Sequence, residues 1–368
     1  MNMQQNQNDI TNDIQINQQQ ELTDSAACIE WFPNTQQKTF AVGSWDGKIK
    51  VIAVQNQGMG GLVQQMEVNV QEPVLGLAWK EDGSMLFIAA ANNLKILNLQ
   101  NQQVNNFGSH TSGISGVFWS QQNQVIITTG FDGMVKIWSM NNQNGPVQQI
   151  NLNKKIYCAA YSQDFLIMGL QQEKICIEHV SNLMRNNVTA PFDSSHLGQT
   201  SQISSIQITA TNIQQNNIEL FFAVASIDGR ANVSTYKSQG NQFKQDSVIT
   251  FKCHKEDKQE GNKKISQLYP VNGIGFNPLS RDFVYTAGSD GKIIYWDINK
   301  KQKIKSFQYG NSPITCCKVS PDGQFMAYAL GYDWHGGVEL YNQFKTFRIA
   351  CHQISQAELS ISNQPYNR

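Results

Sequence analysis

A short pattern recurs along this chain and restricts its fold more than any other feature. Each copy has an alternating apolar run that ends in an aromatic residue, a polar turn and a second apolar run; a Gly, Ser or Ala pair, an Asp-Gly-like turn and a third apolar run follow. Alternation is a strand signal, and Asp-Gly between two such runs is a strong hairpin signal because Gly accepts a positive φ. Each copy therefore predicts a small antiparallel sheet. The clearest copies occupy residues 28–51, 116–138 and 273–297.

Weaker copies bring the total to seven, and most of them recur at about 40 residues, the spacing of WD repeats. The weaker copies occupy residues 77–97, 159–177, 203–230 and 316–341. Insertions near residues 210–219 and 251–270 lengthen two of the intervals. One such sheet cannot bury both of its faces, whereas seven sheets packed radially can. The sequence therefore predicts an all-β fold, a seven-bladed WD-repeat β-propeller.

The predicted propeller spans residues 21–350 and is flanked by two tails. Residues 1–20 form a Gln/Asn-rich tract that we expect to be disordered, so that its removal would leave thermal stability almost unchanged. Residues 351–368 form a C-terminal tail, in which residues 354–359 have the pattern of a short helix. The sequence shows neither the long apolar run of a membrane span nor a signal-peptide pattern, so no membrane insertion is predicted.

Composition and the scattered reactive residues argue against several classes of function. The chain has 28 Lys+Arg and 28 Asp+Glu, and a net charge of +0 argues against a wholly basic nucleic-acid coat. Its cysteines and histidines show no CxxC pair and no metal-ligand spacing, so neither a disulfide framework nor a metal site is indicated. Cys253 beside His254 is no catalytic dyad without a shaped site, and no phosphate-binding Gly-rich loop is present. The sequence thus predicts a protein that is no enzyme, with no cofactor and no small-molecule substrate.

Five aspartates, one in each of five repeats, resemble a carboxylate cluster when only the sequence is considered. We expect each to be a structural turn residue, because the Asp side chain accepts hydrogen bonds from backbone N–H groups of its own turn. They are Asp46, Asp132, Asp228, Asp290 and Asp333.

Two short motifs resemble one small protein family. They are Phe-Lys-Cys-His at residues 251–254 and Tyr-Pro-Val-Asn at residues 269–272, and Gly-Ser-Trp-Asp at 43–46 and Tyr-Asp-Trp at 332–334 fit the same family. Over residues 24–358 the chain resembles the messenger-RNA export propeller of the nuclear pore. The resemblance implies an adaptor that binds the acidic GLEBS segment of a GLFG-repeat nucleoporin. It also implies a location in the nucleus and at the nuclear pore complex of the nuclear envelope, with shuttling to the cytoplasm.

Two other functions remain as alternatives. A sister family, the mitotic-checkpoint propeller that binds checkpoint kinases, shares the first two motifs, so these do not separate the families. Residues 332–334 and 339–342 favour the export family, because the sister's last blade is expected to carry an acidic stretch here. The second alternative is a substrate receptor of a ubiquitin ligase, which is disfavoured because no ligase-docking domain is evident outside the propeller.

The resemblance assigns Arg230, Phe251 and Lys252 to the peptide-binding site. Arg230 follows an Asp-Gly turn, and its guanidinium is expected to form a bidentate pair with a carboxylate of the bound segment. The alternative for Arg230 is a bond to the neighbouring blade. Residues 255–264 contain lysines and acidic residues in similar numbers, so we expect a solvated loop there rather than a site.

A second set, Trp296 with Lys300, Lys301 and Lys303, is assigned to nucleic acid. Cations bind phosphates and aromatic rings stack on unpaired bases, so this set suits single-stranded RNA. The alternative is structural, because many WD repeats carry a tryptophan at the position of Trp296 and outer-strand lysines are often only solvated.

Overall fold

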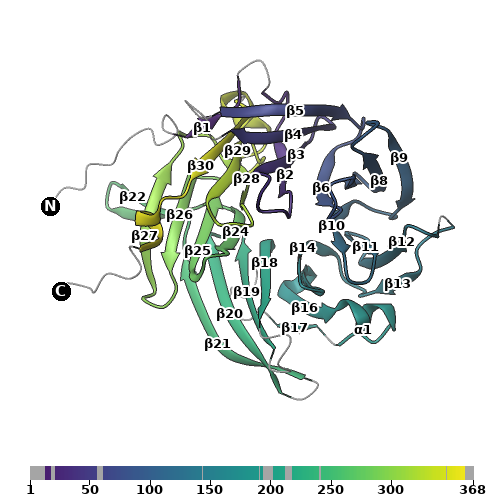
Figure 1. Ribbon diagram of the computed structural model, residues 1–368. Helices are drawn as coiled ribbons and strands as arrows, with labels where there is room; N and C mark the ends of the chain where they lie inside the picture. Colours follow the sequence, from purple (N-terminus) through teal and green to yellow (C-terminus); the bar gives the residue numbers. More distant parts are fainter. Residues whose placement is uncertain are drawn as a thin grey trace.

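The computed structural model describes residues 13–17, 21–55, 61–142, 144–189, 191–193, 202–211, 218–239, 242–344 and 346–360. In this part of the chain, seven four-stranded antiparallel sheets are arranged as blades around a ring (Figure 1). The predicted seven-bladed all-β propeller is therefore confirmed.

Each blade runs outward from an innermost strand a through b and c to an outer strand d. Blade 1 consists of β2 (Ala26–Trp31), β3 (Thr39–Ser44), β4 (Lys48–Gln55) and β5 (Gly61–Asn69), and blade 2 consists of β6 (Val74–Trp79), β7 (Met85–Ala90), β8 (Asn93–Asn98) and β9 (Val104–Ser109). Blade 3 consists of β10 (Ile114–Ser120), β11 (Val125–Gly130), β12 (Met134–Ser139) and β13 (Gln148–Asn151), and blade 4 consists of β14 (Ile156–Ser162), β15 (Phe165–Leu170), β16 (Lys174–His179) and β17 (Phe192–Asp193). Blade 5 consists of β18 (Ile203–Thr211), β19 (Glu219–Ser226), β20 (Arg230–Gln239) and β21 (Gln242–Lys252), and blade 6 consists of β24 (Val271–Asn277), β25 (Ser280–Gly288), β26 (Lys292–Asp297) and β27 (Gln302–Gln308). Blade 7 consists of β28 (Ile314–Val319), β29 (Phe325–Leu330), β30 (Arg348–Gln353) and, as its outer strand, β1 (Ile14–Gln15). The short helices are η3 (Gln171–Glu173), α1 (Val180–Met184), η5 (Val338–Gln343) and α2 (Gln356–Ser360).

The innermost strands close the ring around its axis. Strands β2, β6, β10, β14, β18, β24 and β28 contact one another in this order, and β28 returns to β2. Every a–b pair shifts register after its first residue pair, a bulge that strengthens the local twist. At the seam, Trp31 and Phe40 of blade 1 share one apolar cluster with Phe325 and Ile349 of blade 7. Burial between neighbouring blades therefore completes the core that a single blade cannot form.

Two blades contain a buried hydrogen-bond relay that joins their turn to their tryptophan. In blade 3 the indole N–H of Trp138 donates to Oγ1 of Thr128 (2.8 Å), which lies 2.8 Å from Nε2 of His110, and Nδ1 of that ring lies 3.0 Å from Oδ1 of Asp132. Blade 6 repeats the relay through Trp296, Thr286, His254 and Asp290, at 2.9, 3.0 and 2.7 Å. Burial lowers the pKa of His110 despite its bond to Asp132. The turn aspartates of these two blades thus have the structural role that the sequence predicted.

Residues 13–17 lie on the propeller and not in a disordered tail. β1 pairs with β30 in the register Ile14↔Cys351 and Gln15↔Ala350. Ile16 is 4% exposed and packs in the apolar cluster at the seam. The propeller therefore also includes this segment of the predicted tail, because two isoleucines at alternating positions give a polar tract enough apolar surface to cover an edge strand. Residues 1–12 and 18–20 lie outside the described residues.

Polar and charged side chains of blades 6 and 7 hold both terminal segments. Nδ1 of His352 in β30 lies 2.8 Å from Oδ1 of Asp13, and its Nε2 lies 3.2 Å from Oε2 of Glu358 in α2. Asp13 also accepts a hydrogen bond from the Tyr328 hydroxyl (2.9 Å), and Glu358 accepts one from Lys305 of β27 (2.7 Å). We call these five residues the terminal clasp.

Two further segments differ from the prediction. β30 continues to Gln353, past the boundary expected at residue 350, and α2 follows close to the predicted short helix. Residues 255–264, predicted as a solvated loop, belong to a hairpin of β22 (Lys255–Glu260) and β23 (Lys263–Leu268). Gly261 has φ +60° at its turn, a conformation that glycine adopts without strain.

Candidate functional site

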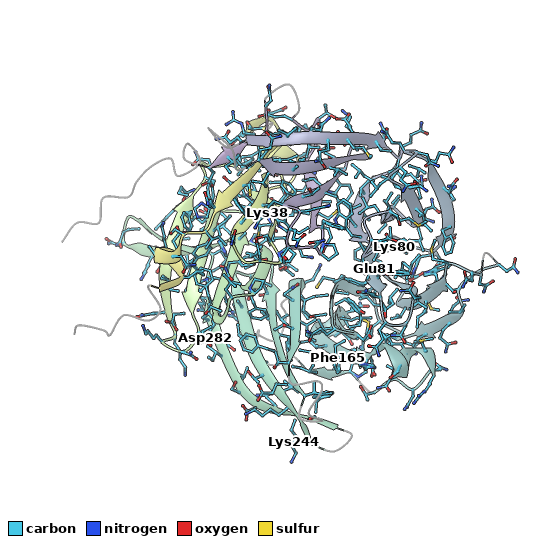
Figure 2. All side chains as sticks on the ribbon, in the orientation of Figure 1. Lys38, Lys80, Glu81, Phe165, Lys244 and Asp282 are labelled. Carbon is cyan, nitrogen blue, oxygen red and sulfur yellow. The ribbon has the colours of Figure 1, made fainter. Side chains whose placement is uncertain are left out.

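The two faces of the ring are built from different connections. We call the face that carries the b–c turns the upper face, and the face that carries the a–b and c–d turns the lower face. Figure 2 labels Lys38, Lys80 and Glu81 in a–b turns, and Lys244 near the tip of the β20–β21 hairpin, so all four mark the lower face. The turn before Arg230 belongs to the upper face, whereas the c–d turn of blade 6 belongs to the lower face.

Arg230 and Lys252 meet at the upper corner of blade 5. They are register partners at the ends of β20 and β21. Gly229 has φ +71°, and a Cβ there would lie 2.7 Å from the carbonyl oxygen of His254, so the turn requires glycine. Nε of Arg230 lies 3.2 Å from Oδ2 of Asp228, and the arginine side chain is 35% exposed. The corner thus presents two cations, one of them oriented by a carboxylate of the preceding turn.

Phe251 points away from this corner. Successive side chains of a strand point to opposite faces of the sheet, so Phe251 and its register partner Ala231 share the face that Lys252 does not. The ring centroid of Phe251 lies 4.7 Å from that of Trp296 in blade 6. The structure therefore groups Phe251 with Trp296 rather than with Arg230.

Trp296 is a member of the blade 6 relay, so the structural role considered as its alternative is present. Its indole N–H donates to Thr286, and its ring is half-buried. Lys303 is its register partner on β27 and is exposed. Lys300 and Lys301 are exposed in the c–d turn, where Nζ of Lys300 lies 3.8 Å from Oδ2 of Asp297. The predicted nucleic-acid set therefore lies together at the lower end of blade 6, with a ring that also holds the blade together.

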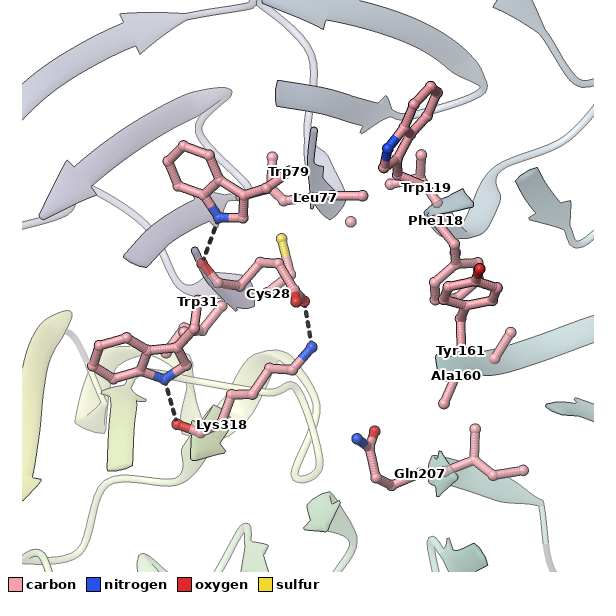
Figure 3. Close-up of a pocket in the computed structure, with 18 of the residues that line it drawn as sticks. Cys28, Trp31, Leu77, Trp79, Phe118, Trp119, Ala160, Tyr161, Gln207 and Lys318 are labelled. Atoms are coloured by element: carbon pink, nitrogen blue, oxygen red, sulfur yellow. Dashed lines mark hydrogen bonds and ion pairs between the residues drawn. The ribbon is translucent and has the colours of Figure 1, made fainter. Parts of the chain in front are cut away.

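A cavity of about 1530 Å³ follows the axis of the ring and is lined by all seven blades (Figure 3). The indole N–H of Trp31 donates to the carbonyl of Lys318 (2.8 Å), and that of Trp79 donates to the carbonyl of Glu30 (3.0 Å). The side chains of Lys318 and Glu30 form an ion pair. Each of these contacts joins neighbouring blades, so the aromatic lining of the cavity has a structural role.

Two buried thiols of the repeat motifs, Cys253 and Cys317, are not activated as nucleophiles. Burial raises the pKa of Cys253 and of Cys317 to about 12, so both stay protonated near neutral pH. Among the described residues, no group of three His, Cys, Asp or Glu side chains is placed to bind a metal ion. No helix in the same part of the chain has the length and apolar character needed to span a membrane.

Sequence reasoning missed a set of large apolar side chains that are exposed on the upper face. Trp45 (51% exposed) and Ile227 (45%) lie in b–c turns, and Trp334 (56%) and Val338 (72%) lie in the connection from β29 to β30. Trp45 and Trp334 belong to the motifs on which the family resemblance rests. A large apolar residue inside a tight polar turn was the signal that could have identified them as surface residues.

Comparison with known proteins agrees with this architecture. Residues 101–139 and 301–335 match the family described as WD domain, G-beta repeat. The chain is 31% identical over 323 residues to the mRNA export factor rae-1 of Caenorhabditis elegans, which covers 86% of this chain and 82% of the relative. It is 29% identical to Protein Rae1 of Drosophila melanogaster, covering 89% and 90% of the two chains. It is 24% identical to the Poly(A)+ RNA export protein of Schizosaccharomyces pombe, covering 95% and 93%.

Proposed function

The chain belongs to the Rae1 family of WD-repeat mRNA export factors, and we propose that it acts in this role as a non-enzymatic adaptor for a nucleoporin. The proposed ligand is an acidic GLEBS-type segment of a GLFG-repeat nucleoporin. The proposed place of action is the nuclear pore complex, with shuttling between nucleus and cytoplasm.

The observation that carries this proposal is the corner formed by Arg230 and Lys252. An acidic peptide needs cations at fixed positions, and a guanidinium binds a carboxylate through two parallel hydrogen bonds. Asp228 already orients the guanidinium, so less side-chain entropy is lost when a ligand binds. The corner stands on two paired strands, and such rigid elements hold a binding geometry better than a loop does.

The test is calorimetric titration with a synthetic GLEBS peptide. Arg230→Ala should weaken binding about 10- to 150-fold, which corresponds to the loss of a charge-assisted hydrogen bond. Arg230→Lys should recover little, because an ammonium cannot form the two-pronged pair. Lys244→Ala, which removes a cation at the lower tip of blade 5, is the matched control and should bind normally. Equal affinities for wild type and Arg230→Ala would remove Arg230 from the site.

The same titration separates the proposal from its alternatives. A checkpoint-kinase peptide that bound more tightly than the GLEBS peptide would favour the mitotic-checkpoint scaffold. Co-purification with ligase subunits, without binding to either peptide, would favour the substrate receptor of a ubiquitin ligase.

Direct binding of single-stranded RNA is a second candidate, favoured by the exposed lysines beside Trp296. Replacing Lys300, Lys301 and Lys303 by Gln should flatten the salt dependence of RNA binding. Each phosphate contact that is lost reduces the number of counterions released when the RNA binds. Trp296→Ala should lower RNA affinity at all salt concentrations if a base stacks on the ring. It should also lower the melting temperature, because the indole N–H bonds Thr286 inside the relay. RNA affinity that is indifferent to all four changes would leave a peptide adaptor whose contact with RNA runs through its partners.

A further inference from the structure

The connection between β29 and β30 differs from the b–c turns of the other blades. Residues 331–347, described except for Lys345, replace the short turn and include η5. Asp333 accepts a hydrogen bond from the backbone N–H of His335 (3.3 Å), which is the turn role predicted for it, and it also ties this connection to blade 6. It accepts hydrogen bonds from Asn272 (2.5 Å) and Ser289 of blade 6 and bonds Nδ1 of His335 (2.6 Å). Burial raises the pKa of Asp333, but these bonds outweigh it and hold the pKa below its usual range.

Tyr332 anchors the other side of the connection. Its backbone N–H donates to Oγ of Ser25 (2.9 Å), and the same hydroxyl donates back to the Tyr332 carbonyl (2.8 Å). These two hydrogen bonds fix the backbone of Tyr332. The Tyr332 hydroxyl donates to the carbonyl of Gly337 (2.5 Å). The connection is therefore held to blade 6 through Asp333 and to the segment before blade 1 through Tyr332.

Trp334, directly after these two anchors, has a strained backbone and an exposed side chain. Its φ is +63°, a left-handed conformation that bulky side chains rarely adopt. Its side chain is 56% exposed and stacks on Tyr341 of η5, with ring centroids 5.4 Å apart and an interplanar angle of 18°. Val338, at the start of η5, is 72% exposed. Strain that persists at an exposed aromatic residue points to a binding role, because neither burial nor backbone preference accounts for it.

A series of ring contacts leads from Trp334 to the Arg230 corner. Tyr332 contacts Trp334 (5.5 Å between centroids) and His335 (5.7 Å), and His335 contacts Tyr269 (6.4 Å). A Cβ on Gly229, the residue before Arg230, would lie 3.2 Å from the Tyr269 carbonyl oxygen. The exposed ring of Trp334 and the cationic corner are thus connected along the upper face.

We propose that Trp334 and Tyr341 bind an apolar side chain of the same acidic segment whose carboxylates Arg230 binds. This inference rests on the proposed function and adds a second, uncharged anchor to it. An apolar peptide side chain fits this pair better than RNA does, because Val338, an exposed neighbour in η5, is apolar. Tryptophan, tyrosine and arginine are also the residues that most often dominate the affinity of peptide and protein interfaces.

The experiment measures binding of the synthetic GLEBS peptide to the full chain at low and high salt. Trp334→Asn is the informative variant, because asparagine tolerates a positive φ and the fold is preserved. We expect it to weaken binding about 10- to 100-fold, equally at both salt concentrations. Arg230→Ala should instead weaken binding most at low salt. Leu279→Ala, which truncates a 58% exposed apolar residue of the lower face, is the control and should bind normally.

The outcomes separate this inference from the proposed function. Normal binding by Trp334→Asn, together with weakened binding by Arg230→Ala, would overturn the aromatic anchor and leave the peptide site intact. Weakened binding by Trp334→Asn alone would support the anchor and remove Arg230. A wild-type chain that does not bind the peptide would overturn both. A peptide in which the apolar residues beside the acidic ones are replaced by Ser should lose affinity for wild type but not for Trp334→Asn, and an equal loss for both would overturn the anchor.

Discussion

His352 in the terminal clasp makes the stability of the propeller depend on pH in a way that can be calculated. Burial alone would lower the pKa of His352, but the hydrogen bonds and charges of Asp13 and Glu358 outweigh it and raise the pKa to about 9. The ordinary value is about 6.5, and each pKa unit corresponds to about 1.4 kcal/mol. The protonated ring therefore contributes about 3 kcal/mol to the free energy of unfolding. Because the pKa is raised on folding, this contribution is complete below about pH 6.5 and is lost as the pH rises through about 9.

Urea denaturation of His352→Gln and wild type at several pH values tests this calculation. The variant should lose about 1 kcal/mol of unfolding free energy at pH 9.5, where a neutral ring keeps one ordinary hydrogen bond, and about 3 kcal/mol more than that at pH 6, where the ring is charged. Other titrating groups are common to both proteins, so their effects cancel in the difference.

His179→Gln provides the control with the opposite sign. Burial lowers the pKa of His179, whose Nδ1 lies 2.8 Å from the hydroxyl of Ser181. The stability that a neutral buried histidine contributes is lost as the pH falls, so the effect of this substitution should shrink towards acid pH. If the effect of His352→Gln were constant from pH 6 to 9.5, the clasp would not hold a charged imidazole.

Two further predictions follow from the fold. Deleting residues 1–17 should lower the melting temperature by several degrees relative to deleting residues 1–12, because only the longer deletion removes β1, Ile16 and Asp13; equal melting curves would show that β1 adds nothing to blade 7. Gly229→Ala should lower the free energy of unfolding by about 1–3 kcal/mol, because it combines a positive φ with a Cβ 2.7 Å from a backbone oxygen. Gly61→Ala, where no atom lies within 4 Å of the added Cβ, should change it little, and similar losses for both glycines in denaturant titrations would contradict the steric argument.

The fold could be predicted because each repeat has its own strand and turn signals. Asp132 and Asp290 precede glycines with positive φ, and these turns define the blades without reference to distant residues. β1 could not be predicted in the same way. It has two residues in a polar tract, and it is stable only because β30, more than 330 residues later, offers an open edge beside Tyr328 and His352.

The candidate site was predictable only as a set of residues and not as a geometry. Arg230, Phe251 and Lys252 belong to neighbouring motifs, yet strand alternation sends Phe251 to the opposite face of the sheet from its neighbour. Its contact with Trp296 depends on how blades 5 and 6 pack, which no local pattern of the sequence encodes. The family resemblance indicated candidate residues without indicating which of them lie together.

Blade 7 shows where function is most visible in a repeat protein. A residue that follows the repeat pattern is explained by the fold, as Asp290 is explained by its relay with His254. A residue that departs from the pattern lowers local stability, and the reason for its conformation must then lie in a contact outside the blade. Residues 332–334 break it most strongly, since Asp333 bonds blade 6 as well as its own turn and Trp334 has a strained backbone and an exposed ring. The departure lies on the same face as the Arg230 corner, so the proposed upper-face ligand, which needs both charge and an aromatic surface, would account for it.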